Sequence, residues 1–184
     1  IRHNCEKSNL KLQVAVRKNL VLLGMMGVGK STLGKIVAKK LKLKFIDTDM
    51  SVEKKCSMKV VDIFQNKGED FFRTQEEMAV LDSLKEKNCV IALGGGAFLN
   101  KKLRDKVLKY SISIWLDVNL KTLNSRIKWN KKRPLLNVKN SIKKIQKLYL
   151  ERKNIYKLSH YKLNCDNLTK ENITKKIINF YETQ

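Results

Sequence analysis

Short apolar segments alternate with amphipathic segments along most of the chain. The apolar segments are rich in β-branched residues and end at polar or glycine-containing turns, so each of them predicts a buried strand. These segments are Leu20 to Leu23, Lys44 to Ile46, Cys89 to Leu93, Ser111 to Leu116 and Tyr161 to Asn164. Because helical periodicity separates them, the pattern predicts an α/β fold in three layers, with a five-stranded, mostly parallel sheet flanked by helices.

The first predicted strand leads directly into a glycine-rich loop with the pattern G-x-x-x-x-G-K-S-T at residues 24–32, and a helical pattern follows. Glycine lets the backbone turn tightly and approach a phosphate group, and the following helix directs N–H groups at the anion. Lys30 can reach the β- and γ-phosphates, and the Ser31 hydroxyl can bind Mg²⁺. The loop therefore predicts a P-loop fold that uses a nucleoside triphosphate. The residues expected to contact the nucleotide are Gly27, Val28, Gly29, Lys30, Ser31 and Thr32.

Carboxylates and glycines follow the next two predicted strands. Asp47 and Asp49 lie at the end of the second strand, where an extended backbone would point both side chains the same way. One carboxylate can help to hold Mg²⁺, and the other can orient a substrate hydroxyl or accept its proton; alternatively, either residue caps a helix that starts near Met50. Residues 94–96 are all glycine, which suits close approach of a ligand to the main chain or a flexible turn. In a parallel sheet these groups converge with the phosphate loop.

Two arginines lie in predicted helices. Arg73 lies early in one of them, where it can pair with Glu77 four residues later. Arg152 lies in a helix predicted from Ser141 to about Leu158, on a face that is otherwise apolar. A guanidinium in that position needs a partner, which is either a buried acidic side chain or the carboxylate of a substrate. The other residues of that face are Ile142, Ile145, Tyr149 and Tyr156.

Composition limits the class of protein. The length of 184 residues suits one domain, which we place at residues 19–184 after a basic extension at 1–18; that extension is either ordinary sequence or the remnant of a transit peptide. The net charge of +23 is spread along the chain, so it favours anionic substrates more than a nucleic-acid partner. No apolar run approaches the ~20 residues that cross a bilayer. We expect a cytoplasmic monomer with no membrane or nucleic-acid partner.

Cysteine and histidine usage argues against a zinc site and against catalysis by histidine. The cysteines are far apart, which predicts reduced thiols, and the two histidines are His3 and His160. A basic segment at about residues 126–138 contains the only proline, and it suits either a mobile lid or a solvated loop. The cysteines are Cys5, Cys56, Cys89 and Cys165.

The set of motifs, in this order and spacing, resembles that of the shikimate kinases from about Asn19 to the C-terminus. The resemblance implies an ATP-dependent enzyme that phosphorylates the 3-hydroxyl of shikimate with Mg²⁺. The matching motifs are the phosphate loop, Asp47-Thr48-Asp49, Ile63-Phe64-x-x-x-Gly68-Glu69-x-x-Phe72-Arg73-x-x-Glu76, Gly94-Gly95-Gly96-Ala97, Arg133-Pro134-Leu135-Leu136 and Glu151-Arg152-x-x-x-Tyr156.

The resemblance also implies a role for each matching residue. It gives binding of the shikimate carboxylate to Arg73 and Arg152, and binding of its hydroxyls to Asp49 and to the backbone of Gly95, with Gly96 beside it. The other implied roles are catalysis by Asp49, Lys30 and Arg133, Mg²⁺ binding by Ser31 and Asp47, closure of the lid by Arg133, and adenine packing by Arg126 with either Thr169 or Lys170. The rival functions are another small-molecule kinase, acting on gluconate or a nucleoside monophosphate, and a nucleic-acid-binding protein switched by ATP.

Overall fold

A computed structural model describes residues 17–128 and 141–184 and contains one five-stranded sheet in which every pair of neighbours is parallel. The strand order is β2-β3-β1-β4-β5, so the strand that leads into the phosphate loop is central. The predicted strands are confirmed, with ends that differ by at most one residue. They are β1 (Asn19–Leu23), β2 (Lys44–Asp47), β3 (Cys89–Ala92), β4 (Ser111–Asp117) and β5 (Tyr161–Asn164).

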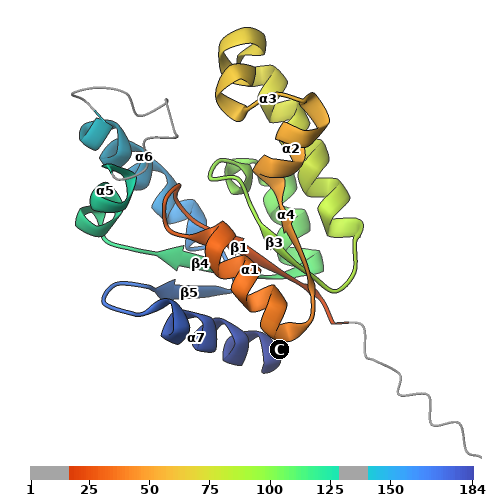
Figure 1. Cartoon of the computed structure of the whole chain (residues 1–184), viewed down its shortest axis with the longest axis vertical. Helices are drawn as coiled ribbons and strands as arrows, with labels where there is room; N and C mark the ends of the chain where they lie inside the picture. Colours follow the sequence, from red (N-terminus) through yellow and green to blue (C-terminus); the bar gives the residue numbers. More distant parts are fainter. Residues whose placement is uncertain (1–16, 129–140) are drawn as a thin grey trace, which may run out of the picture.

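Helices connect the strands and cover the sheet, as the predicted three-layer fold requires (Figure 1). Helices α1 and α7 pack against each other, and α3 packs against α4. None of the described helices is long and apolar enough to span a bilayer. The helices are α1 (Lys30–Leu41), α2 (Thr48–Cys56), α3 (Val60–Lys85), η1 (Ala97–Leu99), α4 (Lys101–Tyr110), α5 (Leu120–Lys128), α6 (Ser141–Tyr156) and α7 (Lys170–Glu182).

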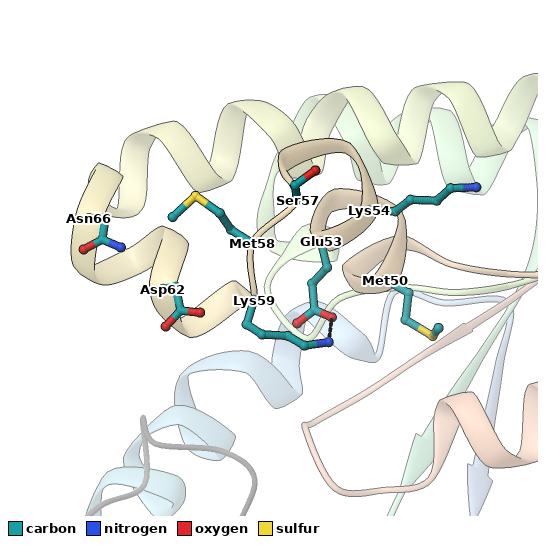
Figure 2. A pocket seen from close by; sticks show the side chains of 8 residues that line it. All are labelled: Met50, Glu53, Lys54, Ser57, Met58, Lys59, Asp62 and Asn66. Atoms are coloured by element: carbon teal, nitrogen blue, oxygen red, sulfur yellow. Dashed lines mark hydrogen bonds and ion pairs between the residues drawn. The ribbon is translucent and has the colours of Figure 1, made fainter.

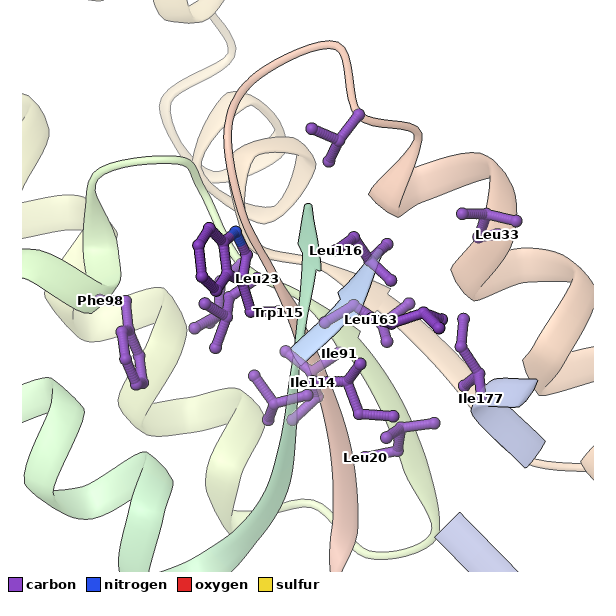
Figure 3. Packing of buried hydrophobic residues seen from close by; sticks show 14 of the residues in the cluster. Leu20, Leu23, Leu33, Ile91, Phe98, Ile114, Trp115, Leu116, Leu163 and Ile177 are labelled. Atoms are coloured by element: carbon purple, nitrogen blue, oxygen red, sulfur yellow. The ribbon is translucent and has the colours of Figure 1, made fainter. Parts of the chain in front are cut away.

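The main hydrophobic core lies on both faces of the sheet. Strands β1, β3 and β4 are buried along their whole length, because helices cover them from both sides. Figure 3 shows Leu23, Trp115 and Phe98 on one side of the sheet, and Leu116 and Leu33 on the other. The strands are therefore held firmly, and the loops at their carboxyl ends start from fixed positions.

A second, smaller core joins α2 to α3 away from the sheet. It contains Val52 from α2 together with Ile63 and Phe72 from the two parts of α3. Those two parts meet at a kink at Gly68, where φ is 83° and ψ is 171°, a backbone conformation that favours glycine. The kink separates the first turns of α3, which pack against α2, from the rest of the helix, which carries Arg73 and Glu76 and ends just before β3.

The cysteines and the histidine in the described ranges are not among the candidate site residues that follow β1, β2 and β3. Cys56, Cys89 and Cys165 are free thiols, as predicted, and burial raises the pKa of Cys165 to about 12. His160 directly precedes β5, and its ring contacts Ser113 in β4. Cys5 and His3 lie outside the described residues.

Candidate active site

The phosphate loop has the backbone geometry that its sequence predicts. Gly24 follows β1 with a φ of 135°, and a Cβ atom there would lie 2.6 Å from the carbonyl oxygen of Leu116. Gly29 caps α1 with a φ of 101°, and within the described ranges no side chain caps the first turn of that helix. The N–H groups of this turn are therefore not taken up by a capping side chain, and the positive end of the helix dipole suits a phosphate group.

Lys30 and Ser31 connect the loop to its surroundings. The ammonium group of Lys30 donates to the carbonyl oxygens of Gly24 and Met25, at 2.9 Å and 3.0 Å. The Ser31 hydroxyl donates to Oδ2 of Asp47 at 2.5 Å, which joins the loop to the end of β2. Hydroxyl and carboxylate oxygens are the ligands that Mg²⁺ prefers, so this predicted pair fits a magnesium ion.

Asp47 and Asp49 point to different partners. The expectation that an extended backbone aligns them was wrong, because α2 already begins at Thr48. The alternative of a helix cap is confirmed for Asp47, whose Oδ1 accepts from the N–H groups of Asp49 and Met50 at 3.1 Å and 3.2 Å. The helical turn directs Asp49 toward Gly94 at the end of β3. One carboxylate therefore faces the phosphate loop, and the other faces the triple glycine.

The triple glycine makes room for charged side chains. A Cβ atom at Gly94 would collide with carboxylate oxygens of Asp49 and Glu76, and one at Gly96 would collide with the guanidinium of Arg73. The glycines with positive φ lie elsewhere, so these positions are not required by an unusual turn. Gly95 is less enclosed, because a Cβ atom there would meet only ordinary contacts, the nearest at 3.5 Å.

Glu76 lies among the candidate site residues, although the sequence analysis gave it no role. Its side chain is 3% exposed and accepts from Nη1 of Arg73 at 2.7 Å. Burial raises the pKa of Glu76, the guanidinium of Arg73 opposes this shift, and the nearby Asp49 adds to it. The expected Arg73–Glu77 pair was wrong, because Arg73 binds Glu76 and Glu69 while Glu77 binds Lys102. The spacing of three residues between Arg73 and Glu76 was the signal in the sequence.

Helix α6 brings Arg152 to the same place. Its Nη1 donates to the carbonyl oxygen of Gly95 at 3.2 Å, and the Tyr156 hydroxyl donates to the same oxygen at 2.5 Å. Ile145 and Tyr156 are buried, as the apolar face predicts, whereas Ile142 is 42% exposed and does not belong to that face. Arg152, Arg73, Asp49 and the triple glycine therefore converge, as expected.

A cavity of about 300 Å³ extends from the phosphate loop to Asp49 and Gly95. Both candidate carboxylates line it, as does Gly95, so the cavity connects the groups predicted for the nucleotide, the metal and the substrate. Its lining residues are Gly27, Gly29, Lys30, Ser31, Thr32, Asp47, Asp49, Leu93 and Gly95.

The residues expected near adenine lie on the other side of the phosphate loop. Nη1 of Arg126 donates to the carbonyl oxygen of Val28 at 3.2 Å. Thr169 caps α7 by accepting from the N–H of Asn172 at 3.1 Å, and Lys170 begins that helix. Arg133 and residues 129–138 of the expected lid lie outside the described residues.

A larger pocket, of about 570 Å³, lies between α2 and the first turns of α3 (Figure 2). Glu53 joins the two helices there, because it accepts from the N–H of Val60 at 3.1 Å and from Lys59 at 3.0 Å. The pocket contains none of the residues predicted for the nucleotide or the acceptor, so we assign the site to the smaller cavity. Its lining residues are Met50, Glu53, Lys54, Ser57, Met58, Lys59, Asp62 and Asn66.

Comparison with known proteins identifies relatives over most of the chain. The family model for shikimate kinase matches residues 26–182. A shikimate kinase from Sulfurihydrogenibium sp. is 42% identical over 161 residues, which cover 88% of this chain and 96% of the relative.

Solved structures give the same result. The structure of shikimate kinase from Acinetobacter baumannii in complex with shikimate superimposes with a TM-score of 0.86 and 30% identity, covering 91% of this chain and 94% of that one. A gluconokinase from Sinorhizobium meliloti reaches a TM-score of 0.59 at 13% identity, with 91% of this chain and 93% of that one covered, and this likeness shows the fold alone.

Proposed function

The chain belongs to the shikimate kinase family, and we propose that it transfers the γ-phosphoryl group of ATP to the 3-hydroxyl of shikimate with the help of Mg²⁺. As a member of this family, it is an ATP-using phosphotransferase. The observation that carries the residue assignment is the cavity in which the phosphate loop meets Asp49 and Gly95. A relative of similar fold binds shikimate, which supports the same acceptor for this chain.

In the part of the cavity that would hold shikimate, two arginines and one carboxylate bind different groups of the substrate. Arg73 and Arg152 bind the shikimate carboxylate, because a guanidinium forms paired hydrogen bonds with that group. Glu76 holds Arg73 from the buried side, at 2.7 Å, so the guanidinium is oriented before the substrate arrives. Asp49 and the backbone of Gly95 and Gly96 bind the hydroxyls, and Asp49 aligns the hydroxyl that attacks.

On the nucleotide side, the loop residues 27–32 hold the phosphates, and Lys30 stabilises charge on the transferring group. Ser31 and Asp47 would hold Mg²⁺, which neutralises charge on the phosphate oxygens when it is bound. Arg126 packs near adenine with Thr169 or Lys170, and Arg133 closes the lid onto the phosphates.

Transfer follows from this arrangement by positioning and electrostatics. The 3-hydroxyl oxygen forms a bond to the γ-phosphorus while the bond from that phosphorus to the β–γ bridging oxygen breaks, and ADP leaves. Asp49 accepts the proton of the hydroxyl, since its carboxylate lines the cavity beside the loop. Holding both reactants in one cavity makes the step effectively unimolecular. We propose that the enzyme works as a cytoplasmic monomer without a nucleic-acid or membrane partner.

Measurement of ADP release from Mg-ATP tests this function directly. Shikimate, gluconate, a nucleoside monophosphate and no acceptor are compared in parallel with the purified chain. We expect stimulation by shikimate alone. Stimulation by gluconate or by the monophosphate would assign the enzyme to one of its rivals. ATP binding without stimulation by any acceptor would instead favour a switch protein, with nucleic acid as the next ligand to test.

A further inference from the structure

Tyr156 is buried at the end of α6, where its hydroxyl contacts the main chain of the acceptor site. The residue is 1% exposed, and its ring packs against Trp115 with centroids 5.9 Å apart. Its hydroxyl donates to the carbonyl oxygen of Gly95 at 2.5 Å, across 61 positions of sequence. A buried tyrosine needs such a partner for its hydroxyl, but this partner belongs to the loop that faces the cavity.

Within the described residues, the carbonyl of Gly95 is the one in the triple glycine that accepts from side chains of α6. The carbonyl oxygens of Gly94 and Gly96 accept from the N–H groups of Ala97 and Leu99 in the adjoining η1, at 3.2 Å and 3.0 Å. A peptide unit is planar, so holding the oxygen of Gly95 also orients the N–H of Gly96 in the same unit. Glycine would otherwise let this plane rotate over a wide range. The hydroxyl therefore fixes the orientation of the peptide that joins Gly95, which lines the cavity, to Gly96.

The same carbonyl oxygen also accepts from Arg152, at the longer distance of 3.2 Å. A carbonyl oxygen has two lone pairs, so it can accept from both side chains at once. When the tyrosine hydroxyl fills one of these positions at short distance, Arg152 reaches this oxygen through Nη1 alone. A guanidinium has five N–H donors, so Arg152 can hold the carbonyl and also bind a carboxylate.

We propose that Tyr156 is a positioning residue of the acceptor site, whose hydroxyl orients the Gly95–Gly96 peptide and leaves the Arg152 guanidinium to the carboxylate of the substrate. This inference rests on the proposed function, because it takes shikimate as the acceptor. Burial raises the pKa of Tyr156, although the charge of Arg152 opposes the shift, so the hydroxyl keeps its proton throughout the neutral range.

Replacing Tyr156 with phenylalanine removes the hydroxyl and keeps the ring against Trp115. The Gly95 carbonyl then depends on Arg152, and a buried acceptor that has lost its neutral donor draws the charged one closer. Both the peptide plane and the guanidinium are displaced from the substrate. We expect the KM for shikimate to rise about tenfold, the size of effect that follows from one lost hydrogen bond in a buried site. The KM for ATP should stay within about twofold, because the phosphate loop keeps its geometry.

Tyr181 provides a matched control on the far side of the molecule. It is 2% exposed, and its hydroxyl donates to the carbonyl oxygen of Lys18 at 2.7 Å, so Tyr181→Phe removes the same kind of hydrogen bond. It lies on α7, and the cavity does not include it. Its loss should lower thermal stability about as much as the loss of the Tyr156 hydroxyl, with both KM values unchanged.

Steady-state kinetics of the full chain and both variants, with thermal unfolding alongside, test the inference. Wild-type activity that depends on shikimate establishes the proposed function first, and its absence would refute that function separately. A rise in the KM for shikimate in Tyr156→Phe alone supports the positioning role. Equal kinetics in the two variants would overturn it. A rise in the KM for ATP as large as the rise in the KM for shikimate would also overturn it. The Tyr156 hydroxyl lies 3.9 Å from the sulfur of Met25 in the phosphate loop, so such an effect would point to the nucleotide side. Failure of Tyr156→Phe to fold when Tyr181→Phe folds would overturn it too, by making the hydroxyl a determinant of stability.

Discussion

At the scale of single residues, the site separates three carboxylates that lie near one another. Asp47 is engaged by Ser31 and by the start of α2, and Glu76 is buried against Arg73. Asp49 lines the same cavity as Asp47, but its carboxylate lies against Gly94 of the triple glycine instead of facing Ser31. This difference in surroundings supports the proposal that Asp49 receives the reacting hydroxyl, and it could not be derived from the Asp-x-Asp pattern alone, which treats Asp47 and Asp49 alike.

Replacement of Asp49 with asparagine tests that assignment. The amide keeps the size of the side chain but accepts a proton far less readily, so we expect shikimate-dependent ADP release to fall at least about 100-fold. ATP should still bind, since Lys30 and the loop are unchanged, and binding can be followed by calorimetry. Glu77→Gln is the control, because it removes an acidic side chain whose partner is Lys102 at the surface. Turnover near the wild-type level in Asp49→Asn would refute the assigned role.

At the scale of elements, the sequence predicted what depends on neighbouring residues. The strands and the phosphate loop were found because apolar runs and glycine positions record local structure. Gly94 and Gly96 are needed because side chains from α2 and α3 occupy the space that a Cβ atom would take, and these side chains meet the loop only after folding. The same limit applies to Tyr156, whose place on an apolar face indicated burial but not its bond to Gly95. Long-range contacts of this kind leave no periodic signal.

The three glycines should therefore differ when each is replaced with alanine. At Gly95 the nearest protein atoms would be 3.5 Å and 3.6 Å from the new Cβ atom, so we expect little loss of stability but a clear rise in the KM for shikimate. At Gly94 the Cβ atom would displace the carboxylates of Asp49 and Glu76, and overpacking of this kind costs about 1–3 kcal/mol. Chemical denaturation combined with kinetics would separate the two effects. Equal destabilisation by both replacements would contradict the distinction.

At the scale of the whole molecule, stability should depend on the protonation of His160. Its Nδ1 accepts from the backbone N–H of Ser113 at 3.1 Å, so a proton on that nitrogen would break the contact. Burial and the charge of Lys18 lower the pKa of His160, against a smaller opposite effect from the backbone of Leu108. The unfolded chain therefore binds more protons near pH 6 than the folded chain does. The contribution of His160 to the free energy of unfolding is present above the pKa of the unfolded state, and it is lost as the pH falls through about 6.5 toward the pKa of the folded state.

Unfolding in urea at pH values from 5 to 8 would measure this dependence. The free energy of unfolding of the wild type should fall more steeply on acidification than that of His160→Asn, by less than about 1 kcal/mol because His160 is exposed to solvent. The carboxylates titrate in both proteins, so the comparison isolates the imidazole. Parallel curves for the two proteins would show that His160 makes no such contribution.

Because β1 lies in the middle of the sheet, the two sides of the site are built from different parts of the chain. On one side, residues 48–97, from the end of β2 to the start of η1, supply Asp49, Arg73, Glu76 and the triple glycine. On the other side, Arg126 follows β4 and Thr169 follows β5. A new acceptor could therefore be selected by substitutions within one continuous stretch of about a quarter of the chain, together with Arg152, while the nucleotide half stays unaltered. In such a chain, specificity for the acceptor can change without any change in the residues proposed to bind ATP.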